Sequence, residues 1–156
     1  TIMNSVALMS AIEKKGGRAR VCSALDIPSV AEPFITRRAL RHLEKGRIVI
    51  CAGGTGNPYF TTDTAAALRA LELECDLLIK GTNTDGVYDA DPEKNKKAKK
   101  YSTVSFDEVL EKDLKVMDAA AIALCRDGKL PIQVFAFGKK GDLSKALLGK
   151  IGTRIG

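Results

Sequence analysis

The sequence has little of what marks a membrane-spanning, secreted or disordered protein. It contains no Trp, one His and 5 Pro, and aromatic residues make up 5% of the chain. Its longest apolar runs, residues 48–52 and 119–124, are much shorter than the roughly 20 residues that span a bilayer. Its start has neither a basic n-region nor an A-x-A cleavage site, so no secretory signal is visible. With 45% hydrophobic and 28% charged residues, the composition is typical of a folded, soluble chain.

Cysteine is also scarce, and it shows no metal-binding or redox spacing. The four residues are Cys22, Cys51, Cys75 and Cys125, and none belongs to a C-x-x-C pair or has a His close by in sequence. Because zinc sites and redox motifs need such clusters, both classes are disfavoured. We interpret the cysteines as buried, reduced thiols, which predicts a cytoplasmic location.

The length of 156 residues is that of one ordinary domain with a single core. The formal net charge of +6 is concentrated locally, because five lysines lie between residues 94 and 100. Such a run is typical of a mobile, solvated loop, and it also offers positive charge to a nucleotide or a nucleic acid. The chain begins with Thr rather than Met, and we expect it to lack an upstream part.

Apolar periodicity predicts helices that alternate with strands. The predicted helices cover residues 2–12, 36–43, 63–73, 105–112, 118–128 and 141–148, the predicted strands cover residues 19–25, 47–52, 76–80 and 131–137, and residues 152–156 form a tail. Thr36, Ser105 and Asp118 are the expected helix starts, with Glu108 as the capping-box partner of Ser105. The alternation predicts a three-layer α/β/α sandwich with a mostly parallel sheet, in which residues 47–52 form a strand buried on both faces.

A glycine-rich loop follows the strand predicted at residues 47–52. Its glycines, in Gly53–Gly56, leave backbone N–H groups uncovered, and the helix that begins near Asp63 adds the partial positive charge of its N-terminus. The loop lacks the Gly-Lys-Ser/Thr of a Walker A motif and the third glycine of a dinucleotide fingerprint. A plain turn capped by Thr62 is the structural alternative. The polar residues between positions 57 and 62 favour a small phosphorylated ligand.

A second polar loop, residues 80–92, directly follows the strand predicted at residues 76–80. It combines hydroxyls, amides, acids and one aromatic ring within 13 positions. Tyr88 offers a face on which a nucleobase can stack, while Thr82 and Asp91 offer polar groups to ribose or phosphate. The spacing of the acids does not match an EF-hand, so we exclude calcium. A plain turn is again the structural alternative.

Three segments of the chain resemble the bacterial uridylate kinases (UMP kinases) of the amino-acid kinase superfamily. They are TGNPYFTTD at residues 55–63, KGTNTDGVYDADP at 80–92 and LKVMDAAAIALCRDGKLPIQVF at 114–135. The resemblance extends over essentially the whole chain. It implies one partial amino-acid kinase-like domain over residues 1–156, with an acceptor side at 1–62 and a nucleotide-donor side at 63–156.

The resemblance also implies which residues bind the two nucleotides. UMP is implied to bind the first loop, at Thr55, Gly56, Asn57, Pro58, Tyr59, Phe60, Thr61 and Thr62. ATP is implied to bind the second loop, at Thr82, Asn83, Tyr88 and Asp91. Asp63 and Asp118 match acidic positions near the transferring phosphoryl group and its Mg²⁺, so they are the implied catalytic and metal-binding residues. Each also has a structural alternative, because an acid at the start of a helix is stabilising.

The activity that the resemblance implies is Mg²⁺-dependent, in-line transfer of the ATP γ-phosphoryl group to UMP, giving UDP and ADP in pyrimidine nucleotide biosynthesis. A homohexamer, with GTP and UTP as effectors, is implied as well. The family's N-terminal half, with its lysine-bearing glycine loop, has no counterpart in this sequence, and phosphoryl transfer depends on such charges. The alternative is therefore a non-catalytic module that binds uridine nucleotides.

Other readings of the sequence are weaker. A nucleic-acid-binding protein is disfavoured, because no aromatic residues interleave with the lysines of residues 94–100. A kinase for glutamate, aspartate or carbamate is disfavoured by the loop at residues 55–62. His42, among charged helix residues, is interpreted as solvated. Lys80 and Lys115 either reach a phosphate or remain exposed.

Overall fold

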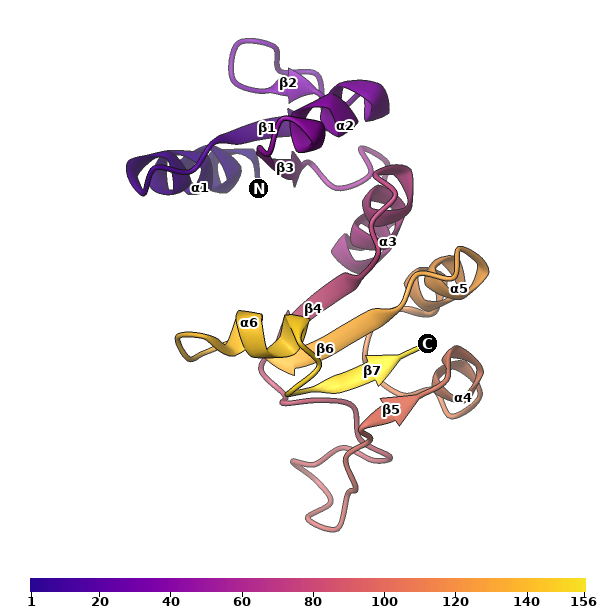
Figure 1. The fold of residues 1–156 in the computed structure, drawn as a ribbon. Coiled ribbons are helices and arrows are strands. Elements are labelled where there is room, and N and C mark those ends of the chain that lie inside the picture. The colour runs from indigo at the N-terminus through magenta and orange to yellow at the C-terminus, as the bar shows by residue number, and fades with distance from the viewer. The chain divides into compact units, whose positions relative to one another are not determined.

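The computed structural model describes residues 1–156 and contains two compact units, Thr1–Leu73 and Glu74–Gly156 (Figure 1). The first unit holds a three-stranded sheet of order β2-β1-β3, and the second holds a four-stranded sheet of order β4-β6-β7-β5. Every strand pair is parallel except β6 with β7. The predicted α/β fold with mostly parallel strand pairing is confirmed, with the strands divided between two sheets.

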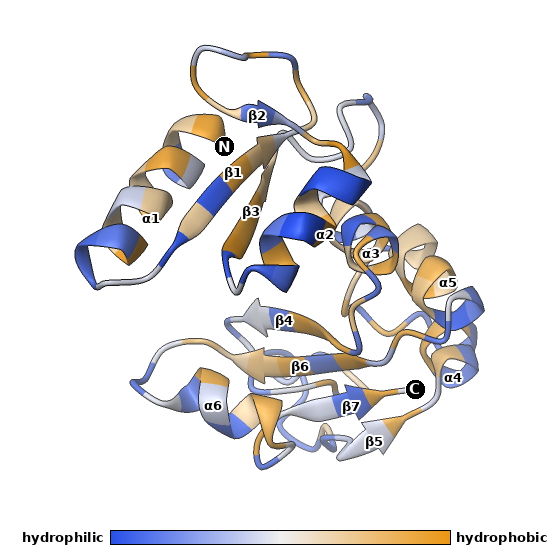
Figure 2. Cartoon of the chain, turned by 45° about the horizontal axis from the view of Figure 1, so that its top comes forward, coloured by the Kyte–Doolittle hydropathy of each residue, from blue (hydrophilic) through white to orange (hydrophobic).

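The first unit is built from α1 (Ile2–Lys14), β1 (Ala19–Ser23), β2 (Glu32–Pro33), α2 (Thr36–Glu44), β3 (Ile48–Ala52) and α3 (Thr62–Glu72). Figure 2 shows α1 and α2 on either side of the strands β1 and β3. Its core is a small apolar cluster of Val21, Ala31 and Ala52, against which the α1 residues Ile2 and Met9 pack. These contacts hold α1 on the sheet through one side of the helix.

Strand β3 lies at the edge of its sheet, and Ala52 is its one buried residue, so the prediction of a strand buried on both faces is wrong. Its one partner is β1, in parallel register from Ala19 opposite Ile48 to Ser23 opposite Ala52. Ile48 is 51% exposed, although Figure 2 shows the whole strand to be hydrophobic. An apolar run indicates that a strand is suited to burial, but it does not reveal how many strands flank it.

The second unit is built from β4 (Leu78–Thr82), β5 (Thr103–Val104), α4 (Phe106–Glu111), α5 (Ala119–Asp127), β6 (Ile132–Ala136), α6 (Asp142–Leu147) and β7 (Thr153–Ile155). The expected tail at residues 152–156 is wrong, because it contains β7. That strand lies between β6 and β5, with Val134 opposite Thr153 and Val104 opposite Ile155. Three residues of alternating character are too short a run to show strand periodicity.

Two of the three predicted helix starts are confirmed. The Asp118 carboxylate accepts a 2.9 Å hydrogen bond from the Ala121 N–H, and the Ser105 hydroxyl accepts one of 3.1 Å from the Glu108 N–H. The carboxylate of Glu108 pairs with Lys112 at 2.7 Å, so a reciprocal capping box does not form. Thr36 as a cap is wrong, because the N-cap residue of α2 is Ile35, which offers no side-chain acceptor.

His42 is buried at 9% exposure, so the interpretation of a solvated histidine is wrong. Its Nδ1 lies 3.0 Å from Arg47 Nη1, and its Nε2 lies 3.1 Å from Glu32 Oε2. Because arginine can only donate, Nδ1 accepts and Nε2 carries the proton that is donated to Glu32. His42 therefore has a structural role, joining α2 to β2 and to the start of β3.

The prediction of buried thiols holds for Cys22 and Cys125 and is wrong for Cys51 and Cys75, which are exposed. Burial raises the pKa of Cys22 and that of Cys125 to about 11. Both buried thiols are therefore neutral packing groups. None of the helices has the length and apolar content that a membrane crossing requires.

Candidate functional site

The glycine loop of the first unit, residues 53–61, joins the end of β3 to α3. Gly53, Gly54 and Gly56 have φ angles of 78°, 64° and 78°, a left-handed conformation that favours glycine. The Gly56 N–H donates to the Gly53 carbonyl at 3.1 Å and closes a tight turn. The N–H groups of Gly54 and Thr55 have no acceptor within the protein. These two donors are available to an anionic ligand.

The residues implied to bind UMP, Thr55–Thr62, form one continuous segment made of this loop and the first residue of α3. Tyr59 is fully exposed, and Phe60 is 57% exposed. Thr61, rather than Thr62, caps α3: its hydroxyl accepts hydrogen bonds of 3.2 Å and 3.1 Å from the N–H groups of Asp63 and Thr64. The segment therefore combines open N–H groups, hydroxyls and aromatic rings beside a helix N-terminus, a combination suited to a phosphorylated ligand.

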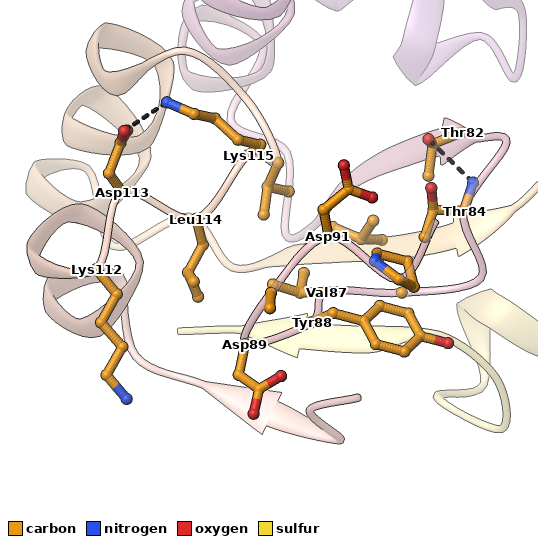
Figure 3. Close-up of a pocket in the computed structure, with 15 residues that line it drawn as sticks. Thr82, Thr84, Val87, Tyr88, Asp89, Asp91, Lys112, Asp113, Leu114 and Lys115 are labelled. Atoms are coloured by element: carbon orange, nitrogen blue, oxygen red, sulfur yellow. Dashed lines mark hydrogen bonds and ion pairs between the residues drawn. The ribbon is translucent and has the colours of Figure 1, made fainter. Parts of the chain in front are cut away.

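A cavity of about 380 Å³ lies in the second unit, next to the carboxyl end of β4. Figure 3 shows Thr82, Thr84 and Tyr88 on one side of it and Asp113 and Leu114 on the other. Small-molecule sites commonly have volumes of about 300–1,000 Å³. The cavity is therefore of a size for a small ligand, and it lies where ligands of α/β sheets gather.

Thr153 of β7 anchors the polar loop that forms one wall of the cavity, through hydrogen bonds of its hydroxyl group. The Val87 N–H donates to the Thr153 hydroxyl at 2.9 Å, and that hydroxyl donates to the Tyr101 carbonyl at 2.6 Å. The Tyr101 N–H returns a 2.8 Å hydrogen bond to the Val87 carbonyl. A Cβ atom at Gly86 would stand 2.6 Å from the Thr153 hydroxyl oxygen, so only glycine fits there. Buried contacts thus fix an otherwise polar loop.

Three of the four residues implied to bind ATP line this cavity, namely Thr82, Tyr88 and Asp91, whereas Asn83 does not. Lys115 also lines it, and Lys80 does not. Apolar side chains complete the lining at Val87, Leu114, Val116 and Val134. The charged residues of the lining are three acids, Asp89, Asp91 and Asp113, and two lysines, Lys112 and Lys115. An apolar surface bordered by hydroxyls and charged groups of both signs suits a polar small molecule that carries a ring.

The opposite wall of the cavity is Lys112–Val116. From the sequence, Lys115 is the one residue of this wall with a predicted ligand contact, although residues 114–116 belong to a segment that carries the resemblance. Leu114 is 8% exposed and faces the cavity from between α4 and α5. The sequence signal for this wall is Leu114, an apolar residue between the charged residues Asp113 and Lys115. An apolar residue just after the polar end of a helix indicates that the chain turns back toward the core there. Lys115 forms an ion pair with Asp113, and both side chains are largely exposed.

A charged network lies at the rim of the polar loop. The Tyr88 hydroxyl donates to Asp85 Oδ1 at 2.7 Å, and Lys100 donates to Asp85 Oδ2 at 2.9 Å. The bond from Tyr88 and the bond from Lys100 lower the pKa of the Asp85 carboxyl. The same carboxylate raises the pKa of the Tyr88 phenol, because ionisation would place two anions together. Lys100, one of the five lysines between residues 94 and 100, is thus paired with Asp85.

The two acids implied to act in catalysis lie at helix starts. Asp63 is in the first turn of α3, and Asp118 is the N-cap residue of α5. No three side chains of His, Cys, Asp or Glu come together as a metal site. Magnesium is commonly held by one or two carboxylates, with phosphates and water as its other ligands. Taken singly, each acid therefore fits a Mg²⁺ ion only as one ligand among phosphate and water oxygens.

The fold is that of an α/β protein with two polar loops at strand ends, and the chain belongs to the amino acid kinase family, whose model matches residues 1–136. The chain is 59% identical over 149 residues to the uridylate kinase of Zymomonas mobilis, covering 96% of this chain and 62% of that protein. The chain thus spans less than two thirds of that curated relative.

The chain is also similar to solved structures of UMP kinases. The crystal structure of UMP kinase from Bacillus anthracis matches with a TM-score of 0.96 and 39% identity, over 99% of this chain and 65% of that one. The structure of UMP kinase from Ureaplasma parvum matches with a TM-score of 0.94 and 36% identity, over 99% of this chain and 67% of that one. These similarities cover both units of the chain.

Proposed function

We propose that the chain is the nucleotide-binding part of a uridylate kinase, which transfers the γ-phosphoryl group of ATP to UMP and forms UDP and ADP. The observation that carries the proposal is the 59% identity to a uridylate kinase over 96% of the chain. The glycine loop of the first unit and the cavity of the second unit support it, because each offers the chemistry that one nucleotide requires.

The acceptor UMP is assigned to Thr55–Thr62. The open N–H groups of Gly54 and Thr55 suit its phosphate, and the N-terminus of α3 adds a favourable dipole. Exposed Tyr59 and Phe60 offer ring faces to the uracil base. A phosphate monoester has a second pKa of about 6, so UMP is largely a dianion at neutral pH.

The donor ATP is assigned to the cavity lined by Thr82, Tyr88 and Asp91, with Asn83 at the adjoining turn. The apolar wall around Leu114 suits the adenine ring, while Thr82 and Asp91 suit the ribose and Lys115 suits the phosphates. Lys115 exchanges its Asp113 partner for a phosphate oxygen in this scheme. Its exposure leaves it free to turn toward the ligand.

The mechanism needs no nucleophile from the protein, because the acceptor oxygen is already anionic. What the chain supplies is orientation and compensating charge, the two main contributions to phosphoryl transfer. Mg²⁺, when bound, neutralises phosphate charge. Asp63 and Asp118 are proposed to hold it through one carboxylate each, or through its water ligands. The acceptor and donor sides at residues 1–62 and 63–156 remain part of the same proposal.

The oligomeric state and regulation follow the same proposal. We infer a homohexamer in the cytoplasm, with GTP and UTP as effectors, on the strength of the resemblance alone. Sedimentation of the purified chain tests the first of these: a hexamer supports it, and a monomer at micromolar concentration contradicts it for this chain.

Formation of ADP by the purified chain tests the proposed activity. The reaction contains Mg²⁺ and ATP with UMP, with CMP or without an acceptor. ADP formation that requires UMP supports the kinase. Absence of turnover, together with saturable UMP binding, supports a second candidate, a uridine-nucleotide-binding module without activity.

A further inference from the structure

Arg69, in the last turns of α3, lies behind the glycine loop rather than in it. Its side chain is 13% exposed and makes three contacts. Nη1 donates to Glu72 Oε2 at 2.6 Å, Nη2 donates to the Gly54 carbonyl at 3.3 Å, and the guanidinium carbon stands 3.9 Å from the centre of the Phe34 ring. Arg69 thus joins α3, the loop and the segment after β2.

The contact with Gly54 determines the direction of a neighbouring donor. The Gly54 carbonyl and the Thr55 N–H belong to one planar peptide unit and point in opposite directions. Because Arg69 holds the Gly54 carbonyl, the Thr55 N–H points away from the Arg69 guanidinium. That N–H has no acceptor within the protein. Glycine at position 54, with φ of 64°, leaves this peptide unit easy to rotate when nothing holds it.

We propose that Arg69 is a positioning residue for the acceptor phosphate: by holding the Gly54 carbonyl, it keeps the Thr55 N–H aimed at the ligand. The inference deepens the proposed function and rests on it for the identity of the ligand, which is a nucleoside monophosphate. Arg69 itself acts from behind the loop and does not touch the phosphate.

Only arginine meets all three contacts at once. Its planar fork places separate N–H donors on Glu72 and Gly54, while its flat face stacks on Phe34. Lysine keeps the charge but has a single donor atom, and it satisfies Glu72 before the carbonyl because the carboxylate is the stronger acceptor. The variant Arg69→Lys therefore releases Gly54 while keeping the ion pair.

Two measurements on the 156-residue chain test the proposal, with Arg69→Lys as the variant. Arg37→Lys is the matched control, since Arg37 is an exposed arginine of α2 without a hydrogen bond or ion pair. Phe34→Leu is a second variant, which keeps an apolar neighbour but removes the ring under the guanidinium. All three changes are conservative in size, so the fold of the first unit is expected to survive.

The first measurement is amide hydrogen exchange, which needs no ligand. The reporter is the Gly56 N–H, whose bond to the Gly53 carbonyl closes the turn. We expect Arg69→Lys to speed its exchange at least about tenfold, the scale of losing a hydrogen bond to a charged group. The amides of β1 and the control variant are expected to stay unchanged. Unchanged exchange at Gly56 would overturn the proposal.

The second measurement compares the affinity for UMP with that for uridine by calorimetry. In Arg69→Lys the Thr55 N–H no longer has a fixed direction, so UMP binding is expected to weaken about tenfold. Uridine binding is expected to stay unchanged, because uridine lacks the phosphate. An equal loss for both ligands, or no loss for UMP, would overturn the positioning role. If the unaltered chain binds no UMP, the proposed function fails, and Gly56 exchange alone then decides whether Arg69 holds the loop.

Discussion

Tyr88 and Asp85 are joined by a 2.7 Å hydrogen bond from phenol to carboxylate within the polar loop at residues 80–92. Lys100 holds the other carboxylate oxygen at 2.9 Å. The residue that offers an aromatic face to the cavity is thus fixed by its own hydroxyl group.

The variant Tyr88→Phe is expected to raise the pKa of the Asp85 carboxyl toward its ordinary value. The hydrogen bond from Tyr88 is the largest cause of the lowered pKa, and Lys100 is the next. Such a carboxylate contributes stability above its unfolded pKa, and the contribution is lost as pH falls through the folded pKa. Carboxyl NMR titration measures the midpoint directly. Tyr101→Phe is the control, and an unchanged midpoint in Tyr88→Phe would contradict the account.

Asp118 has a capping role and a proposed catalytic role, which two substitutions separate. Asn caps helices about as well as Asp, so Asp118→Asn is expected to change the free energy of unfolding by less than about 0.5 kcal/mol. Asp118→Ala loses the 2.9 Å bond to Ala121 and is expected to cost about 1 kcal/mol. Urea denaturation measures both.

The proposed catalytic role of Asp118 requires its charge, which Asn lacks. In a chain that forms ADP with UMP, Asp118→Asn is expected to lower turnover by about 10²-fold, the scale of losing one electrostatic contact to the transition state. Turnover that survives the change to Asn would assign Asp118 to helix capping alone.

Thr61 is expected to matter more than Thr62 for the stability of α3. The Thr61 hydroxyl accepts from two N–H groups of the first turn, and its loss in Thr61→Ala is expected to cost about 1 kcal/mol. Thr62 is exposed in the first turn, so Thr62→Ala is expected to stay within about 0.5 kcal/mol. Equal effects of the two changes on the urea midpoint would contradict the assignment of Thr61 as the N-cap residue of α3.

The thiols are expected to react with iodoacetamide in two groups. Exposed Cys51 and Cys75 react first, while Cys22 and Cys125 are buried with pKa values of about 11 and react only on unfolding. Peptide mass spectrometry after brief alkylation identifies the sites, and alkylation in urea shows that all four can react. Early labelling of Cys22 or Cys125 in the folded chain would contradict their burial.

The features that the sequence predicts well are those decided by neighbours along the chain. Asp118 and Ser105 cap helices through N–H groups three residues away, and the Gly53–Gly56 turn closes within four residues. Thr82, Tyr88 and Asp91 lie within 10 residues of sequence, so a single well-held loop suffices to bring them to one cavity.

The features that cannot be predicted from the sequence depend on residues far away in the chain. The edge position of β3 depends on which strands pair with it, and β7 is recognisable only through β6 and β5. His42 is buried because Glu32 and Arg47 satisfy both ring nitrogens. The contact of Arg69 with Gly54 spans 15 positions, and nothing in the local pattern of α3 distinguishes Arg69 from a solvated arginine.

Calorimetric titration of the purified chain with UMP, and with CMP for comparison, tests the central claim that the glycine loop of the first unit is a UMP site. The account predicts saturable binding of one UMP per chain, with CMP at least about tenfold weaker, because a site that hydrogen-bonds one base leaves polar groups unpaired with another. Absence of UMP binding, or equal affinity for UMP and CMP, would contradict it.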